Sequence, residues 1–163
     1  SDLPQSAQAA IGQYDVRATP LQMAMVAAGI ANGGSVMTPY LIQSVRSANL
    51  DVIQSAPDPV ELSQAVSQQT ASILTKMMVS VVQNGSGVRA QIPGVEVAGK
   101  TGTAQHDPKK PPHAWFISFA PATDPKVAVA VVVEDGGVTG SEIGGGRVAA
   151  PIARAVMQAV LGR

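Results

Sequence analysis

The chain has 163 residues, about the size of one domain, and 45% of them are hydrophobic whereas only 13% are charged. This composition excludes a disordered chain, and it predicts a surface so poor in charge that part of it should face more protein. The formal net charge is zero and the aromatic residues are one Trp, two Tyr and two Phe, so we expect no nucleic-acid partner.

The sequence contains no cysteine, which excludes a disulfide framework and a thiolate zinc site without fixing the compartment. The longest unbroken apolar run, Val127 to Val133, is shorter than the roughly 20 residues that cross a bilayer. The chain starts at Ser1 without a methionine or a signal peptide, so we expect a piece of a longer protein.

Residues 1–18 are mixed and polar, which predicts a loop. A helix is predicted to follow, because Thr19 can cap it, Pro20 suits its first position and Gln22 completes a capping box. The run Asn32-Gly33-Gly34 is expected to end this helix.

The middle of the chain predicts short β-prone pieces and a second helix. Leu41-Ile42 and Val52-Ile53 suggest a hairpin that turns near Asn49, and residues 55–65, with two prolines, suggest a connection. A helix is expected from the cap Ser67 to Asn84-Gly85.

The last part of the chain predicts a sheet. Strands are expected over Val95 to Ala104, Ala114 to Phe119 and Val127 to Val133, as antiparallel neighbours. The loop Glu134 to Gly146 is glycine-rich, and its Gly144-Gly145-Gly146 run should give flexibility before a final helix over Val148 to Leu161. The predicted fold class is α+β, an antiparallel sheet flanked by helices.

The stretch from Gly94 to Thr103 satisfies two motifs. Gly94 to Thr101 fits the phosphate loop G-x-x-x-x-G-K-[ST], and Lys100 to Thr103 contains K-T-G. A phosphate loop needs a helix that starts at its Lys-Thr pair, and no apolar helical stripe begins there. Alternation predicts a strand instead, with Lys100 and Gly102 on one side and both threonines on the other. A strand edge can bind a peptide as an added strand.

The surrounding residues carry a family resemblance in their order and spacing. With the motif strand they resemble the C-terminal half of the transpeptidase domain of class B penicillin-binding proteins, whose fold is that of serine β-lactamases. The departures are Tyr14 where the family usually has glycine, and Ser86 where it often has threonine. The matching pieces are Ile11-Gly12-Gln13, Ala18 to Ala24, Ala31 to Gly34 with Pro39, Gly85-Ser86-Gly87, Ala98 to Gln105, Ala114-Trp115-Phe116, Phe119-Ala120-Pro121 and Ala149 to Ala153.

Two family motifs are missing. No lysine has a serine three residues before it, so S-x-x-K is absent. Ser47-Ala48-Asn49 matches S-x-N, but it follows the Gly-Gln and Ala-Asn-Gly-Gly pieces that it should precede, so we interpret it as an incidental turn. Residues 1–163 are therefore expected to be the C-terminal portion of one transpeptidase domain whose S-x-x-K and S-x-N part lies upstream.

The resemblance implies a peptidoglycan D,D-transpeptidase that acts on D-Ala-D-Ala stem peptides and is acylated by β-lactams, although this chain alone should be inactive. Lys100 would aid proton movement, the hydroxyls of Thr101 and Thr103 would bind the carboxylate, and the Thr103 N–H would stabilise the oxyanion. Gly102 would let the substrate approach closely and Gln105 would line the cleft. Trp115 would pack in the core or form a wall of the cleft.

No cofactor is expected. No metal site is expected either, because His106 and His113 have no third ligand at a suitable spacing. The implied partners are the stem peptide, β-lactam antibiotics, the remainder of the domain, and cell-wall synthesis or division proteins. The implied location is the extracytoplasmic face of the bacterial cell membrane, with the anchor outside this chain.

Three other functions remain open. They are a non-catalytic β-lactam sensor, a fragment of a class D-like β-lactamase, and a division-site scaffold. The chain length and the Ala-Asn-Gly-Gly and Ala-Trp-Phe pieces favour the transpeptidase over the β-lactamase.

Overall fold

A three-stranded antiparallel sheet forms the centre of the computed structural model, which describes residues 3–14, 16–107, 109–137 and 144–162. Its strands are β5 (Ala98–Ala104), β6 (His113–Ala120) and β7 (Val127–Val133), in the order β5-β6-β7. The predicted antiparallel neighbours are confirmed. The first strand begins at Ala98 and not at the expected Val95, because Val95 forms an isolated bridge with Ile92 across a turn.

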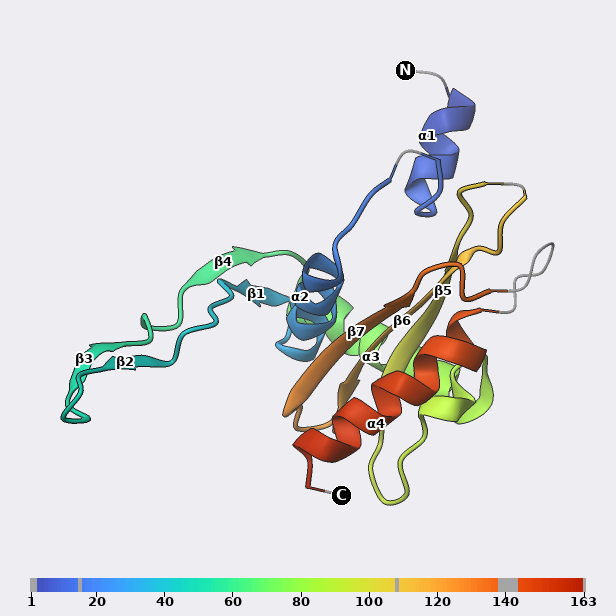
Figure 1. The fold of residues 1–163 in the computed structure, drawn as a ribbon. Coiled ribbons are helices and arrows are strands. Elements are labelled where there is room, and N and C mark those ends of the chain that lie inside the picture. The colour runs from blue at the N-terminus through green and yellow to red at the C-terminus, as the bar shows by residue number, and fades with distance from the viewer. Residues whose placement is uncertain (1–2, 15, 108, 138–143, 163) are drawn as a thin grey trace.

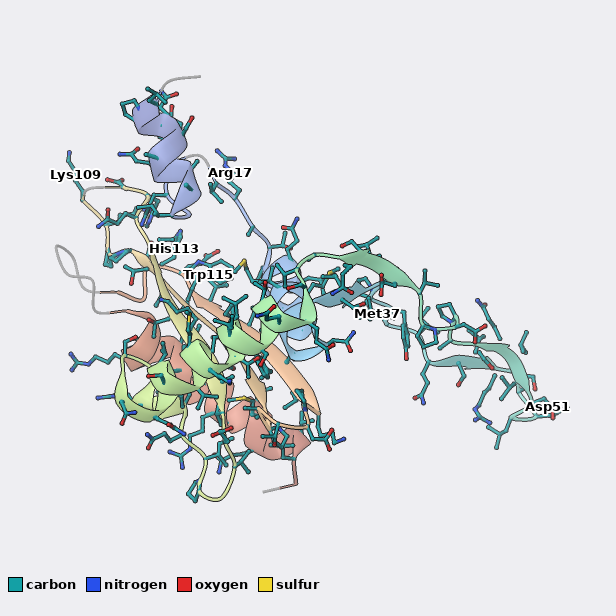
Figure 2. The ribbon with its side chains drawn as sticks, turned by 180° about the vertical axis from the view of Figure 1, so that it is seen from behind. Arg17, Met37, Asp51, Lys109, His113 and Trp115 are labelled. Carbon is teal, nitrogen blue, oxygen red and sulfur yellow. The ribbon has the colours of Figure 1, made fainter. Side chains whose placement is uncertain are left out.

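Helices cover both faces of this sheet (Figures 1 and 2). On one face, Phe116 of β6 is fully buried in a cluster with Met157 of α4 (Ala150–Val160). On the other face, Phe119 is fully buried in a cluster with Met78 of α3 (Gln68–Asn84) and Ile30 of α2 (Pro20–Ala31). The register of β5 against β6 therefore decides which motif residues face α4 and which face the opposite way.

Helix α2 begins with the predicted capping box. Thr19 Oγ1 accepts a hydrogen bond from the Gln22 N–H at 3.2 Å, and Gln22 Oε1 accepts one from the Thr19 N–H at 2.8 Å. The helix is apolar on all sides, yet only Ala27 and Gly29 are buried. Helices of this kind normally lie inside a protein, so α2 presents apolar surface that the described residues leave uncovered.

Helix α3 also starts and ends as predicted. The Ser67 side chain accepts a hydrogen bond from the Thr70 N–H, and Gly85 is the C-cap. A short 3-10 helix, η1 (Val88–Ala90), then leads into the turn before β5. Helix α4 is preceded by a π-helix, η2 (Gly145–Ala149), so the regular α-helix starts two residues later than expected. Residues 138–143 of the predicted glycine-rich loop lie outside the described residues.

Three further expectations were wrong. Residues 3–10, predicted as loop, form helix α1 (Leu3–Ala10), which buries none of its residues and so lacks the apolar stripe that would have marked it. Leu41-Ile42 lies outside the strands, which are β1 (Ser35–Met37), β2 (Ser44–Arg46) and β3 (Val52–Ser55). The predicted connection over 55–65 contains strand β4 (Glu61–Gln64), which pairs with β1.

These four strands form an arm that projects from the body (Figure 1). The expected hairpin is present as β2 paired with β3, with its turn near Asn49. Every residue of β2, β3 and β4 is exposed, so no alternation between a buried and an exposed face marks them in the sequence. Among the described residues no helix combines the length and the hydropathy needed to span a membrane.

Candidate functional site

The K-T-G motif lies on strand β5, at one edge of the sheet. No helix begins at Lys100, so the phosphate-loop alternative is wrong and the strand prediction is confirmed. In the part of the chain that the structure describes, β5 pairs only with β6, and its other edge faces outward.

Two hydrogen bonds show which backbone groups face that outer edge. Gln13 Nε2 donates to the Thr103 carbonyl at 3.1 Å, and Lys100 Nζ donates to the Thr101 carbonyl at 2.6 Å. In an antiparallel strand the N–H and C=O of one residue point to the same side. The amides of Thr101 and Thr103 are therefore directed away from β6, toward the outer edge of the sheet.

The side chains of the motif divide between the two faces of the sheet. Thr101 lies opposite Phe116 and Thr103 opposite Ala114, on the face covered by α4. Lys100 lies on the other face and is exposed. Gly102 pairs with the half-buried Trp115, and a Cβ at Gly102 would lie 3.0 Å from the Trp115 Cβ. Gln105 follows the end of β5 and is exposed.

A pocket of about 360 Å³ opens beside the two threonines. Ser86, in the turn after α3, approaches from one side, with its Oγ 2.8 Å from Thr101 Oγ1. The exposed arginines Arg89 and Arg147 complete the polar part of the lining. The remaining lining residues are Val88 and residues 144–146.

Glycines bring the far wall of this pocket against the sheet. A Cβ at Gly145 would collide with the Trp115 carbonyl, and a Cβ at Gly146 would collide with the Ser86 carbonyl. Gly144 and Gly145 are buried, and the glycines of this wall allow a close approach between backbones. Their packing places Arg147 at the pocket.

A second cluster ties the outer end of β5 to the end of β7. His106 Nε2 lies 3.0 Å from Asp135 Oδ1, and the rings of His106 and His113 stack with their centroids 4.0 Å apart. The Asp135 N–H donates to His113 Nδ1 at 3.0 Å. Figure 2 shows His113 near the end of the sheet, close to the loop that carries Lys109.

Sequence reasoning missed Asp135 because it is brought to His113 only by the pairing of β6 with β7. The three side chains lie close enough to surround a cation. The contacts of His106 and His113 with Asp135 join two loops, and we call this cluster the tether.

The arginines Arg89 and Arg147 were missed as well. The only signals available in the sequence were a basic residue just after Gly85-Ser86-Gly87 and another just after the glycine run.

The edge strand with its K-T-G motif, the hydroxyl-lined pocket and the helices on both sheet faces define a class of protein. The penicillin-binding protein transpeptidase domain model matches residues 3–158, and the chain belongs to this family.

The most similar relatives include two mycobacterial proteins. The chain is 53% identical over 154 residues to peptidoglycan D,D-transpeptidase PbpA of Mycolicibacterium smegmatis, a match that covers 93% of this chain and 31% of the relative. It is 50% identical to the PbpA of Mycobacterium tuberculosis, with the same coverage. The chain thus spans about a third of the length of these curated relatives.

Solved structures agree with the sequence matches. The crystal structure of PBPA from Mycobacterium tuberculosis superposes with a TM-score of 0.88 at 47% identity, covering 99% of this chain and 39% of that chain. The penicillin G acyl-enzyme complex of the same protein gives a TM-score of 0.85 at 48% identity, covering 99% and 37%. The resemblance to class B penicillin-binding proteins is confirmed, and the relatives and structures named above are penicillin-binding proteins A.

Proposed function

We propose that this chain supplies the substrate-binding strand of a serine peptidoglycan D,D-transpeptidase. The observation that carries the proposal is the outer edge of β5, where the Thr103 amide faces outward beside the Thr101 and Thr103 side chains. A peptide can add to such an edge through backbone hydrogen bonds. The similarity to peptidoglycan D,D-transpeptidases PbpA supports the choice of substrate class.

The proposed reaction is acyl transfer in two steps. A serine outside this chain attacks the carbonyl of the penultimate D-Ala of a stem peptide, the bond to the terminal D-Ala breaks, and that D-Ala leaves with a proton on its amine. The amine of a second stem then attacks the resulting ester and releases the serine. A β-lactam acylates the same serine, as in the imipenem and penicillin G acyl-enzyme complexes of PBPA from Mycobacterium tuberculosis.

The residues of β5 have separate roles in this scheme. The outward N–H of Thr103 donates to the oxyanion that forms on the attacked carbonyl, and one such donor contributes about 3 kcal/mol to the transition state. The hydroxyls of Thr101 and Thr103 bind the terminal carboxylate. Lys100, on the opposite face, places positive charge near the serine of the missing S-x-N motif and aids proton movement there. Gly102 lets the substrate approach the strand, and Gln105 and Trp115 line the cleft.

We propose that the remainder of the domain covers two surfaces that the described residues leave exposed. The apolar surface of α2 and the outer edge of β7 would pack against the part that carries S-x-x-K and S-x-N. The complete protein would work with cell-wall synthesis or division proteins at the extracytoplasmic face of the bacterial membrane, held by an anchor outside this chain.

A labelling experiment tests the proposal. The protein that includes the upstream part of the domain is treated with a fluorescent penicillin, digested and mapped by mass spectrometry. We expect one labelled serine, located before Ser1. A labelled serine within residues 1–163, or no covalent label at all, would refute the assignment.

The role of Lys100 is tested by Lys100→Ala in the same protein. Removing a positioned proton-transfer group should slow acylation by roughly 100-fold or more, while the fold persists because the side chain is exposed. Lys76→Ala, at an exposed lysine of α3, is the matched control and should acylate at the wild-type rate. Equal rates in the two variants would remove Lys100 from the mechanism.

A further inference from the structure

Two arginines border the pocket beside β5 and have no role in the reaction as proposed so far. Arg89 belongs to η1 and Arg147 to η2, so they reach the pocket from segments far apart in the chain. Both side chains are exposed to solvent. Their convergence depends on the close contact of Gly146 with the Ser86 carbonyl, which holds η2 against the turn that leads to Arg89.

Among the described residues, the lining of this pocket contains no carboxylate. Within residues 3–14, 16–107, 109–137 and 144–162, Asp124 contacts Lys126 and Asp135 contacts His106 and His113, and neither arginine is paired with a carboxylate. Two guanidinium groups around one pocket repel each other, and an anion placed between them removes that repulsion. The hydroxyls of Ser86 and Thr101, hydrogen-bonded to each other at 2.8 Å, leave one O–H donor free at the same wall.

The shape of the donors indicates which anion fits. Guanidinium groups bind planar carboxylates through two parallel N–H bonds, which a lysine ammonium cannot do. The pocket adjoins Thr101 and Thr103, so an anion there would lie next to a peptide bound along the edge of β5. The donor stem peptide ends in a carboxylate, and penicillins carry one on their ring system.

We propose that Arg89 and Arg147 are specificity-determining residues that bind this carboxylate and select substrates and β-lactams that carry it. The inference rests on the proposed transpeptidase function, because it needs a ligand bound along β5. The arginines strengthen the binding of the anionic ligand, whereas Lys100, on the other face of the strand, speeds the acylation step.

The test uses Arg89→Gln and Arg147→Gln in the protein that includes the upstream part of the domain. The second-order rate constant of acylation is measured with benzylpenicillin and with its methyl ester, which lacks the negative charge. We expect each variant to lose roughly tenfold in rate with benzylpenicillin, as for the loss of a hydrogen bond between charged groups, and to keep its rate with the ester. The loss should shrink at high salt.

Arg46→Gln is the matched control, since it removes the same charge from the distant arm, where Arg46 donates to the Leu50 carbonyl. It should leave both rate constants unchanged. Equal losses of rate with benzylpenicillin and its ester would mean that the arginines only support the fold. No loss with either compound would mean that the arginines do not touch the ligand. Both results overturn this inference while the transpeptidase proposal stands. If the wild-type protein is not acylated at all, both proposals fail.

Discussion

At Gly99, just before the K-T-G triplet, the chain leaves no room for a side chain. A Cβ built there would lie 2.5 Å from Phe116 Cζ and 3.1 Å from Val82 Cγ2. Both neighbours are almost fully buried, so neither can move aside easily. This single glycine therefore sets how closely β5 approaches the ring of Phe116, and with it the position of Lys100 and Thr101.

Gly99→Ala should accordingly destabilise the protein. Overpacking of a filled core costs about 1–3 kcal/mol, and loss of register in β5 should also lower the acylation rate. Urea unfolding of the complete protein measures the first effect. Lys100→Ala in the same strand is exposed and should unfold at nearly the wild-type midpoint; a midpoint for Gly99→Ala equal to it would show that Phe116 can give way.

At the residue scale, the sequence predicted only those site residues that belong to a short, continuous motif. Lys100, Thr101 and Thr103 follow from four consecutive letters, and their strand follows from alternation. Arg89 and Arg147 could not be predicted. They line the same pocket only because Gly145 and Gly146 fit against the backbones of β6 and of the Ser86 turn. Contacts of that kind arise from three-dimensional packing and leave no local pattern.

At the scale of elements, the loop after β5 is held by the tether of His106, His113 and Asp135. The tether joins the outer end of the motif strand to the end of β7. Loops with few buried apolar contacts open readily, so side-chain tethers decide how often they do. Gln105, which is proposed to line the cleft, directly precedes His106 in the sequence.

His106→Ala should make this loop open more often. Trypsin cleavage between Lys109 and Lys110, both exposed, is expected to become several-fold faster in the folded protein. Glu134→Ala, which removes an exposed carboxylate next to Asp135 but outside the tether, is the control. If both variants are cut at the wild-type rate, the stacked histidines do not restrain the loop.

Elements with local signals were predicted well. Thr19 with Gln22, and Ser67, marked the starts of α2 and α3, and the apolar run of β7 gave its bounds. Helix α1 and strand β4 were missed because both are exposed along their whole length, so no buried face imposes a hydrophobic period on their sequences.

At the scale of the whole molecule, the sheet has two outer edges with different proposed uses. The edge of β5 would take a peptide, and the edge of β7 would take the rest of the domain. The chain spans about a third of the length of its curated relatives. In the proposed arrangement the site forms only where this part meets the part with the serine, so the binding strand and the nucleophile come from opposite ends of one domain.

Strand β7 has a consequence for the behaviour of this chain in solution. Its sequence, VAVAVVV, contains no charge, no proline and no glycine, and among the described residues its outer edge has no partner. Segments of this composition with an open edge pair readily with copies of themselves. We expect residues 1–163, expressed alone, to form particles whose light scattering rises with concentration and time, whereas the protein with the upstream part stays monodisperse. A monodisperse fragment would show that the edge of β7 is protected within residues 1–163. If the fragment scatters light, the amount of scattering measures how much of this edge the upstream part normally covers.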